Sequence, residues 1–125
     1  MLNKALVVDD DDLILNFMTT LLQRKFGLRV STAKDGLEGI EQLKKGGVDV
    51  IFLDIMMPKL DGIQFLEMIR SEFRFNHIPV IIISAANNKE IIAKLLKLGI
   101  KDYILKPLEF LKITDKLNDI FAEID

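Results

Sequence analysis

Short runs rich in residues that favour strands alternate with segments of helical periodicity along the whole chain, and this alternation limits the possible folds more than any other feature. The runs lie at residues 5–8, 28–32, 48–53, 80–83 and 103–105. Residues 50–53 and 80–83 contain no polar side chain, which is typical of strands that are buried on both faces of a sheet. Such strands require helices on both sides of the sheet to cover them.

Five intervening segments carry apolar residues at the spacing of a helix face. These residues are Ile14, Phe17, Met18, Leu21 and Leu22; Leu37, Ile40 and Leu43; Ile63, Leu66 and Ile69; Ile92, Leu95 and Leu96; and Ile113, Leu117, Ile120, Phe121 and Ile124. We expect these stripes to form the core, and Gly27 to end the first helix. Five successive strand–helix units predict an α/β fold with a five-stranded parallel sheet and helices on both faces.

Composition excludes several classes of function. The 125 residues predict one domain over 1–125, and the absence of cysteine excludes disulfides, thiolate metal sites and cysteine nucleophiles. A net charge of −2 gives no electrostatic reason to expect direct binding to nucleic acid. No apolar run approaches the roughly 18 residues needed to cross a bilayer, so we expect no membrane insertion and a cytoplasmic location.

Polar side chains follow four of the five predicted strands, at the point where each strand ends. In chain order they are Asp9 to Asp12, Asp54, Ser84 and Lys106. Ligands of a parallel α/β sheet bind outside the carboxyl ends of its strands, so these positions are candidates for a site. If the first and third strands are neighbours, we expect the carboxylates of Asp9, Asp10 and Asp54 to converge.

A cluster of this kind suits phosphoryl chemistry. Close carboxylates repel one another unless a cation intervenes, and ligands that offer only oxygen favour Mg²⁺. A carboxylate such as that of Asp54 can attack phosphorus, while Lys106 and Ser84 can supply an ammonium group and a hydroxyl to the phosphoryl oxygens. The alternative interpretation is that Asp9 and Asp10 cap the first helix and that Asp54 is a turn residue. For Asp11 or Asp12 we expect only a capping role.

The chain resembles the receiver domain of two-component response regulators over almost its whole length. The resemblance rests on four segments in order, residues 7–11 (VVDDD), 50–62 (VIFLDIMMPKLDG), 83–85 (ISA) and 102–107 (DYILKP). It implies the flavodoxin-like fold with strand order 2-1-3-4-5. It also implies a module that catalyses its own phosphorylation and dephosphorylation but turns over no external substrate.

The resemblance also implies a role for each polar residue at the strand ends. Asp54 corresponds to the phosphoacceptor, which receives its phosphoryl group from a phosphohistidine of a sensor histidine kinase or a histidine phosphotransfer protein. Mg²⁺ would be bound by Asp10, by Asp54, by Asp9 through water, and by the backbone carbonyl of Met56. These assignments are implied by the family and not by the spacing alone.

The remaining implied roles concern the response to phosphorylation. Lys106 would pair with the phosphoryl oxygens, and its bond to Pro107 would be cis. Ser84 would move to bind the phosphate, and Tyr103 would turn inward into the space that Ser84 leaves. The surface that changes would lie on the fourth helix, fifth strand and fifth helix, and would bind a downstream protein that the sequence does not identify.

A second function fits one of these motifs. Phosphatases of the haloacid dehalogenase type carry their nucleophile in an Asp-x-Asp motif after the first strand, and Asp9 to Asp11 have that spacing. The residues that follow, Asp12 and Leu13, differ from the small residues expected there. A phosphoryl group found on Asp9 instead of Asp54 would distinguish this alternative from a receiver.

Overall fold

The computed structural model describes residues 2–57 and 59–124, and its centre is a five-stranded parallel sheet in the order β2-β1-β3-β4-β5. The strands are β1 (Lys4–Val8), β2 (Arg29–Ala33), β3 (Val50–Leu53), β4 (Val80–Ser84) and β5 (Asp102–Leu105). The helices are α1 (Asp12–Phe26), α2 (Gly36–Lys44), α3 (Gly62–Ser71), α4 (Lys89–Lys97) and α5 (Phe110–Ile124). The predicted fold class and strand order are therefore confirmed, and the predicted strand ends differ from the observed ones by no more than two residues.

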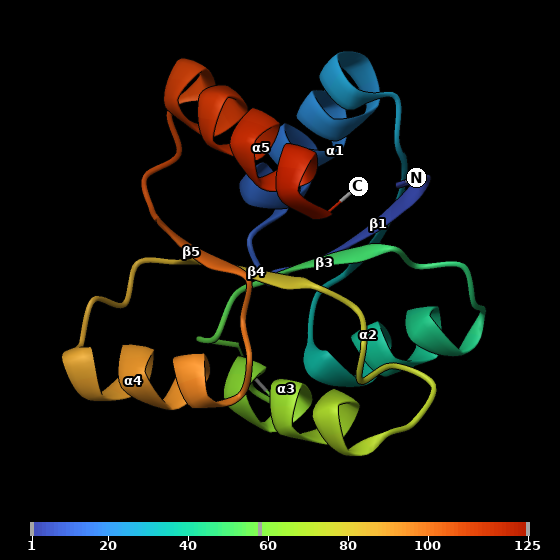
Figure 1. The fold of residues 1–125 in the computed structure, drawn as a ribbon, viewed down its shortest axis with the longest axis vertical. Coiled ribbons are helices and arrows are strands. Elements are labelled where there is room, and N and C mark those ends of the chain that lie inside the picture. Colours follow the sequence, from blue (N-terminus) through green and yellow to red (C-terminus); the bar gives the residue numbers. More distant parts are fainter. Residues whose placement is uncertain (1, 58, 125) are drawn as a thin grey trace.

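The helices form two layers, with α1 and α5 on one face of the sheet and α2, α3 and α4 on the other (Figure 1). Alternate strand residues point to opposite layers, so that Leu6 and Leu53 join the cluster beneath α2 to α4, whereas Val7 and Phe52 join the cluster beneath α1 and α5. Every residue of β3 and β4 is buried, including Ser84 at the end of β4, as the apolar runs 50–53 and 80–83 predict for most of both strands. Among the described residues, no helix is long and apolar enough to cross a membrane.

Two of the predicted helix stripes include residues that do not belong to the core. Leu37 on α2 is 53% exposed and Leu96 on α4 is 61% exposed, although both were expected in the core. On α2 the predicted Ile40 and Leu43 do contact the core, but the remaining buried positions are two glycines, Gly36 and Gly39, which the apolar pattern does not register. A Cβ atom at Gly39 would lie 2.8 Å from the ring of Phe65, so this face of α2 packs too closely for a side chain.

On α4 the residues that contact the core are Ile91, Leu95 and Leu98, with spacings of four and three. The predicted stripe of Ile92, Leu95 and Leu96 is therefore rotated from the observed one. Both stripes fit helical periodicity, because Ile91, Ile92, Leu95 and Leu96 lie on one continuous apolar face of α4 that is wider than its contact with the core. Only the position of α4 near the edge of the sheet decides which of them is buried.

Strand register places the polar residues at one edge of the sheet. Val8 of β1 pairs with Leu53 of β3, so the residues that follow them, Asp9 and Asp54, leave the sheet side by side. Ser84 is the last residue of β4 and pairs with Leu105 of β5. The residue after Leu105 is Lys106, which therefore begins at the same edge.

Candidate functional site

Three carboxylates converge beyond the ends of β1 and β3. The Asp54 N–H donates to the Val8 carbonyl (2.9 Å) and the Asp9 N–H donates to the Ala33 carbonyl (3.0 Å), which extends the sheet hydrogen bonding to these two residues. One carboxylate oxygen from each of Asp9, Asp10 and Asp54 lies within 4.8 Å of the others. Asp9 and Asp54 are buried and Asp10 is exposed, so the predicted cluster is present and opens to solvent at Asp10.

Lys106 provides a cation to two of these carboxylates. Its ammonium nitrogen lies 2.9 Å from Asp9 Oδ2 and 3.3 Å from Asp54 Oδ2. Burial by itself would lower the pKa of Lys106, but the contacts with Asp9 and Asp54 outweigh it and the pKa is raised. Lys106 therefore stays protonated, and it compensates only part of the negative charge of three carboxylates.

The buried carboxylate of Asp9 is only partly compensated by its neighbours. Its Oδ1 accepts a hydrogen bond from the Asp11 N–H (2.9 Å), but Oδ2 is buried and accepts no aligned hydrogen bond from any described residue, despite its proximity to Lys106. Burial raises the pKa of Asp9, and the nearby Asp54 charge adds to this rise, while Lys106 and the Asp11 N–H oppose it. An unsatisfied buried carboxylate oxygen beside two further carboxylates fits a hard divalent cation such as Mg²⁺.

Helix capping falls to other aspartates. Asp11 is the N-cap of α1 and accepts a hydrogen bond from the Leu13 N–H (2.9 Å), while Asp12 begins α1 and forms an exposed ion pair with Lys34 (3.0 Å). Asp9 and Asp10 therefore do not cap α1, and the alternative interpretation of these two residues is wrong. The capping role that the sequence predicts for Asp11 or Asp12 belongs to Asp11.

Asp54 keeps a turn contact as well as its place in the cluster. Its Oδ1 accepts a hydrogen bond from the Met56 N–H (3.2 Å), which is the contact that a turn aspartate makes. Met56 follows as an exposed side chain at the mouth of the site, 65% accessible to solvent. Pro58, which belongs to the predicted turn after Met56, lies outside the described residues.

Ser84 and Tyr103 meet at the loop that leads to α4. The Ser84 hydroxyl is fully buried and accepts a hydrogen bond from the Ala86 N–H (3.2 Å). The Tyr103 hydroxyl donates to the Ala86 carbonyl, so both side chains hold the same residue. Burial raises the pKa of Tyr103, with a smaller rise from the Asp54 charge and an opposing contribution from the Ser84 hydroxyl.

The backbone between β5 and α5 also matches its prediction. The bond between Lys106 and Pro107 is cis, as the family resemblance implies. The Lys106 N–H donates to the Ser84 carbonyl (2.9 Å), which continues the pairing of β4 with β5. Through this bond the end of β5 directs Lys106 toward the carboxylates.

Sequence reasoning missed one residue that shapes the site. A Cβ atom at Gly62, the first residue of α3, would lie 2.5 Å from the Asp54 carbonyl oxygen and 2.4 Å from Ile55 Cα. Glycine is therefore required for α3 to begin directly against the backbone of the phosphoacceptor candidate. In the sequence Gly62 looks only like part of a turn, and no sequence pattern indicates that it contacts the backbone of Asp54.

Comparison with known proteins agrees with this geometry. The family model described as the response regulator receiver domain matches residues 5–118. The chemotaxis protein CheY of Treponema pallidum is 40% identical over 119 residues, which are 94% of this chain and 81% of that protein. Hybrid signal transduction histidine kinase D of Dictyostelium discoideum is 37% identical over 103 residues, which are 82% of this chain and 6% of that kinase.

Solved structures show the same fold. The structure of the Francisella response regulator 1452 receiver domain superimposes with a TM-score of 0.83 at 34% identity, and the match covers 98% of this chain and 99% of that one. The alternative of a haloacid dehalogenase-type phosphatase finds no support in these relatives.

Proposed function

The chain belongs to the response regulator receiver domain family of two-component signalling, and we propose that it accepts a phosphoryl group on Asp54 in a reaction that depends on Mg²⁺. One observation carries this proposal. Three carboxylates lie within 4.8 Å of one another at the ends of β1 and β3, and Lys106 contacts two of them. In this arrangement Asp54 is both buried beside a fixed ammonium group and open to solvent through its exposed neighbour Asp10.

In the proposed reaction, a carboxylate oxygen of Asp54 attacks the phosphorus of a phosphohistidine. A bond forms between that oxygen and phosphorus, the bond between phosphorus and the imidazole nitrogen breaks, and the imidazole leaves with the electron pair of that bond. The Lys106 ammonium lies 3.3 Å from Asp54 Oδ2, where it can stabilise the phosphoryl oxygens. Hydrolysis of the acyl phosphate by water would return Asp54 to its starting state.

The unsatisfied Oδ2 of Asp9 supports Mg²⁺ as the cofactor. Asp9, Asp10 and Asp54 would hold the ion together with the Met56 carbonyl, and the bound ion would supply positive charge to the transferring phosphoryl group. In the absence of the ion, the three carboxylates repel one another and would also repel an anionic phosphodonor.

The phosphodonor would be a sensor histidine kinase or a histidine phosphotransfer protein. The likeness to part of a hybrid histidine kinase supports a partner of this kind. The contacts of Ser84 and Tyr103 with Ala86 would carry the change at Asp54 to α4 and β5, and so to a surface that binds a downstream protein. The cytoplasmic location stays a prediction from the sequence.

Phosphorylation by acetyl phosphate tests this function directly. With Mg²⁺ present, intact mass spectrometry should show one added phosphoryl group, and fragmentation should locate it on Asp54. Asp54→Asn should abolish the gain, whereas Asp12→Asn, which removes an exposed carboxylate outside the cluster, should leave it unchanged. A full gain in Asp54→Asn would refute the assignment, and a phosphoryl group on Asp9 would favour the phosphatase alternative.

A further inference from the structure

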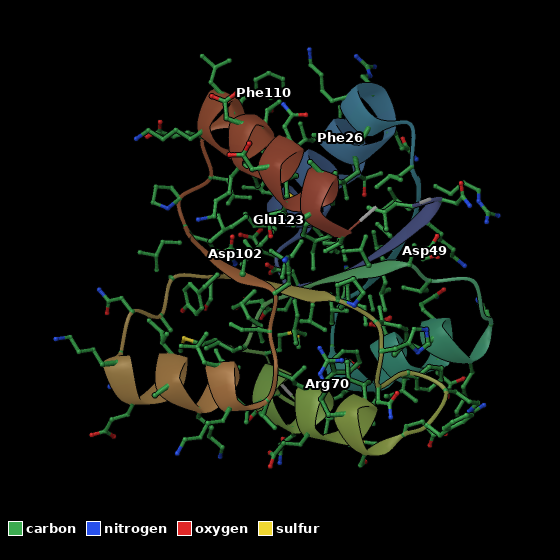
Figure 2. The ribbon with its side chains drawn as sticks, in the orientation of Figure 1. Phe26, Asp49, Arg70, Asp102, Phe110 and Glu123 are labelled. Atoms are coloured by element: carbon green, nitrogen blue, oxygen red, sulfur yellow. The ribbon has the colours of Figure 1, made fainter. Side chains whose placement is uncertain are left out.

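One arginine on the far side of the molecule from the carboxylate cluster makes an unusual set of contacts. Arg70, in the last turn of α3, donates hydrogen bonds to four backbone carbonyls and to no side chain that the structure describes. Two acceptors precede β4, namely Asn76 (3.3 Å) and Ile78 (3.0 Å), and two end α4, namely Leu98 (2.9 Å) and Gly99 (3.2 Å). Figure 2 labels Arg70 on the α3 side of the sheet.

The charge of Arg70 is compensated by these carbonyls alone among the residues that the structure describes. The Arg70 guanidinium forms no ion pair with any carboxylate that the structure describes. Burial lowers the pKa of Arg70. Its partners at Leu98 and Gly99 lie at the carboxyl end of α4, where the unpaired carbonyls give the helix a partial negative charge. Arg70 therefore caps α4 from a neighbouring helix with charge-assisted hydrogen bonds.

Other contacts fix the same end of α4. Leu95 is fully buried, and Leu98 and Ile100 pack against the core beneath α2 to α4. The Lys101 N–H donates to the Val80 carbonyl (2.7 Å), which ties the following loop to β4. The carboxyl end of α4 is therefore held by hydrogen bonds from Arg70 of α3, which also binds the segment before β4, and the loop that follows α4 is held by a hydrogen bond to β4.

The amino end of α4 is held differently. Residues 87–90 are exposed, and within the described part of the chain the side chain of the N-cap Asn88 accepts hydrogen bonds only from the nearby Glu90 and Ile91 N–H groups. The loop before it is held through Ala86, whose N–H and carbonyl bind Ser84 and Tyr103. Both of these side chains belong to the proposed phosphorylation site, so this attachment can change with the state of Asp54 while the Arg70 contacts do not.

We propose that Arg70 makes the carboxyl end of α4 a fixed pivot, so that phosphorylation displaces only the loop at residues 85–88 and the first turns of α4. The inference deepens the proposed function and rests on it where the motion is concerned. The anchoring by Arg70 itself depends on neither phosphate nor Mg²⁺. The two parts can therefore be tested separately.

Amide hydrogen exchange in the unphosphorylated protein tests the anchor. In Arg70→Gln the amides of Leu98, Gly99 and Lys101 should exchange at least tenfold faster than in the parent, while Ile91 and Ile92 change less than twofold. Arg70→Lys keeps the charge but not the planar fork, so it should act in the same direction and serves if Arg70→Gln does not fold. Unchanged exchange at these three amides, or equal acceleration along the whole of α4, would overturn the proposal.

Two control variants separate this effect from charge loss and from general destabilisation. Arg74→Gln removes an exposed arginine whose contacts are Glu72 and Phe75, and should leave α4 unchanged. Ile120→Val trims the core on the other face of the sheet, and should accelerate exchange without preference for residues 98–101. A selective effect on α4 in either control would count against a specific role for Arg70.

The pivot is tested with beryllofluoride, a mimic of the acyl phosphate, and Mg²⁺. In the parent, amide shift changes should be concentrated at residues 85–92 and absent at 98–101, whereas in Arg70→Lys they should extend to 98–101. Changes at 98–101 as large as those at 85–92 in the parent would show that no pivot exists. If no amide beside Asp54 responds in any variant, the proposed function has failed, and the exchange experiment still decides whether Arg70 anchors α4.

Discussion

Replacing Asp10 by asparagine should stabilise the protein when Mg²⁺ is absent and make it less stable than the parent when Mg²⁺ is abundant. The cause is the same in both conditions. The Asp10 carboxylate lies within 4.8 Å of two other carboxylates and no described residue forms an ion pair with it, so its charge opposes folding until a cation binds. Asparagine keeps the shape of the side chain and removes the charge.

The size of the effect follows from the separation and the exposure of Asp10. At 4.8 Å a pair of unit charges repels by about 0.9 kcal/mol in water and by about 3.5 kcal/mol at a dielectric constant of about 20. Because Asp10 is exposed, the value for water applies to each of its two pairs. Asp10→Asn should therefore gain about 1–2 kcal/mol in metal-free buffer, or roughly 5 °C in Tm.

Mg²⁺ should reverse the order. At a free concentration a hundredfold above its Kd, the ion stabilises the parent by about 2.7 kcal/mol, whereas a variant that binds a hundredfold more weakly gains only about 0.4 kcal/mol. Urea or thermal unfolding followed by circular dichroism, in EDTA and in excess Mg²⁺, measures both values. Asp12→Asn is the matched control, since Asp12 is exposed and pairs with Lys34 outside the cluster. A variant that is less stable than the parent in EDTA, or that gains as much from Mg²⁺, would refute the reasoning.

Three further predictions concern the same site. Lys106→Ala should reduce the amide shift changes that beryllofluoride causes around Tyr103, and undiminished changes would exclude the proposed role of the ammonium group. Burial raises the pKa of Asp9 above its usual value of 3.8, so the folded protein holds this proton more tightly than the unfolded chain does. In metal-free buffer the free energy of unfolding should therefore fall as pH rises from 3.8 through the raised pKa. The difference in unfolding free energy between Asp9→Asn and the parent should grow over that pH range, and a constant difference would contradict the shift. Met56 and Ala86 flank the site with side chains that cannot orient a water molecule, so Met56→Asn with Ala86→Glu should accelerate loss of the phosphoryl group by about ten- to a hundredfold, or about 1.4–2.7 kcal/mol of barrier. Equal decay in parent and double variant would mean that these two residues only pack.

The fold and the cluster could be predicted because their signals are local and repeated. Each buried strand is a short apolar run, and the residue that ends a strand must lie at the edge of the sheet, so Asp9 and Asp54 are placed by counting alone once β1 and β3 are neighbours. The stripe on α2 was predicted less well because Gly36 and Gly39 face the core there. Leu60 lies against Gly36 and Phe65 lies against Gly39 too closely for a side chain at either position. Both neighbours are distant in sequence, so the apolar pattern of α2 does not indicate them.

Arg70 and Gly62 could not have been predicted from the sequence. The partners of Arg70 are backbone carbonyls, which are present at every position and carry no mark in the sequence. Gly62 approaches the backbone of Asp54 and Ile55, and that contact also leaves no side-chain pattern. Features that depend on backbone atoms brought together by the tertiary fold appear only in the structure.

The charge of the site determines what it can accept. Asp9, Asp10, Asp54 and Lys106 together have a formal charge of −2, which equals the net charge of the whole chain, so the remaining ionisable side chains sum to zero. The cluster itself therefore carries a local charge of −2 at one edge of the sheet, and this charge attracts divalent cations and repels phosphate groups. The ammonium group of Lys106 already contacts Asp9 and Asp54, so a further cation would be needed to offset the remaining charge when the proposed anionic phosphodonor approaches. The repulsion among these carboxylates lowers the stability of the metal-free protein, and it is the physical reason why the proposed phosphorylation would depend on Mg²⁺.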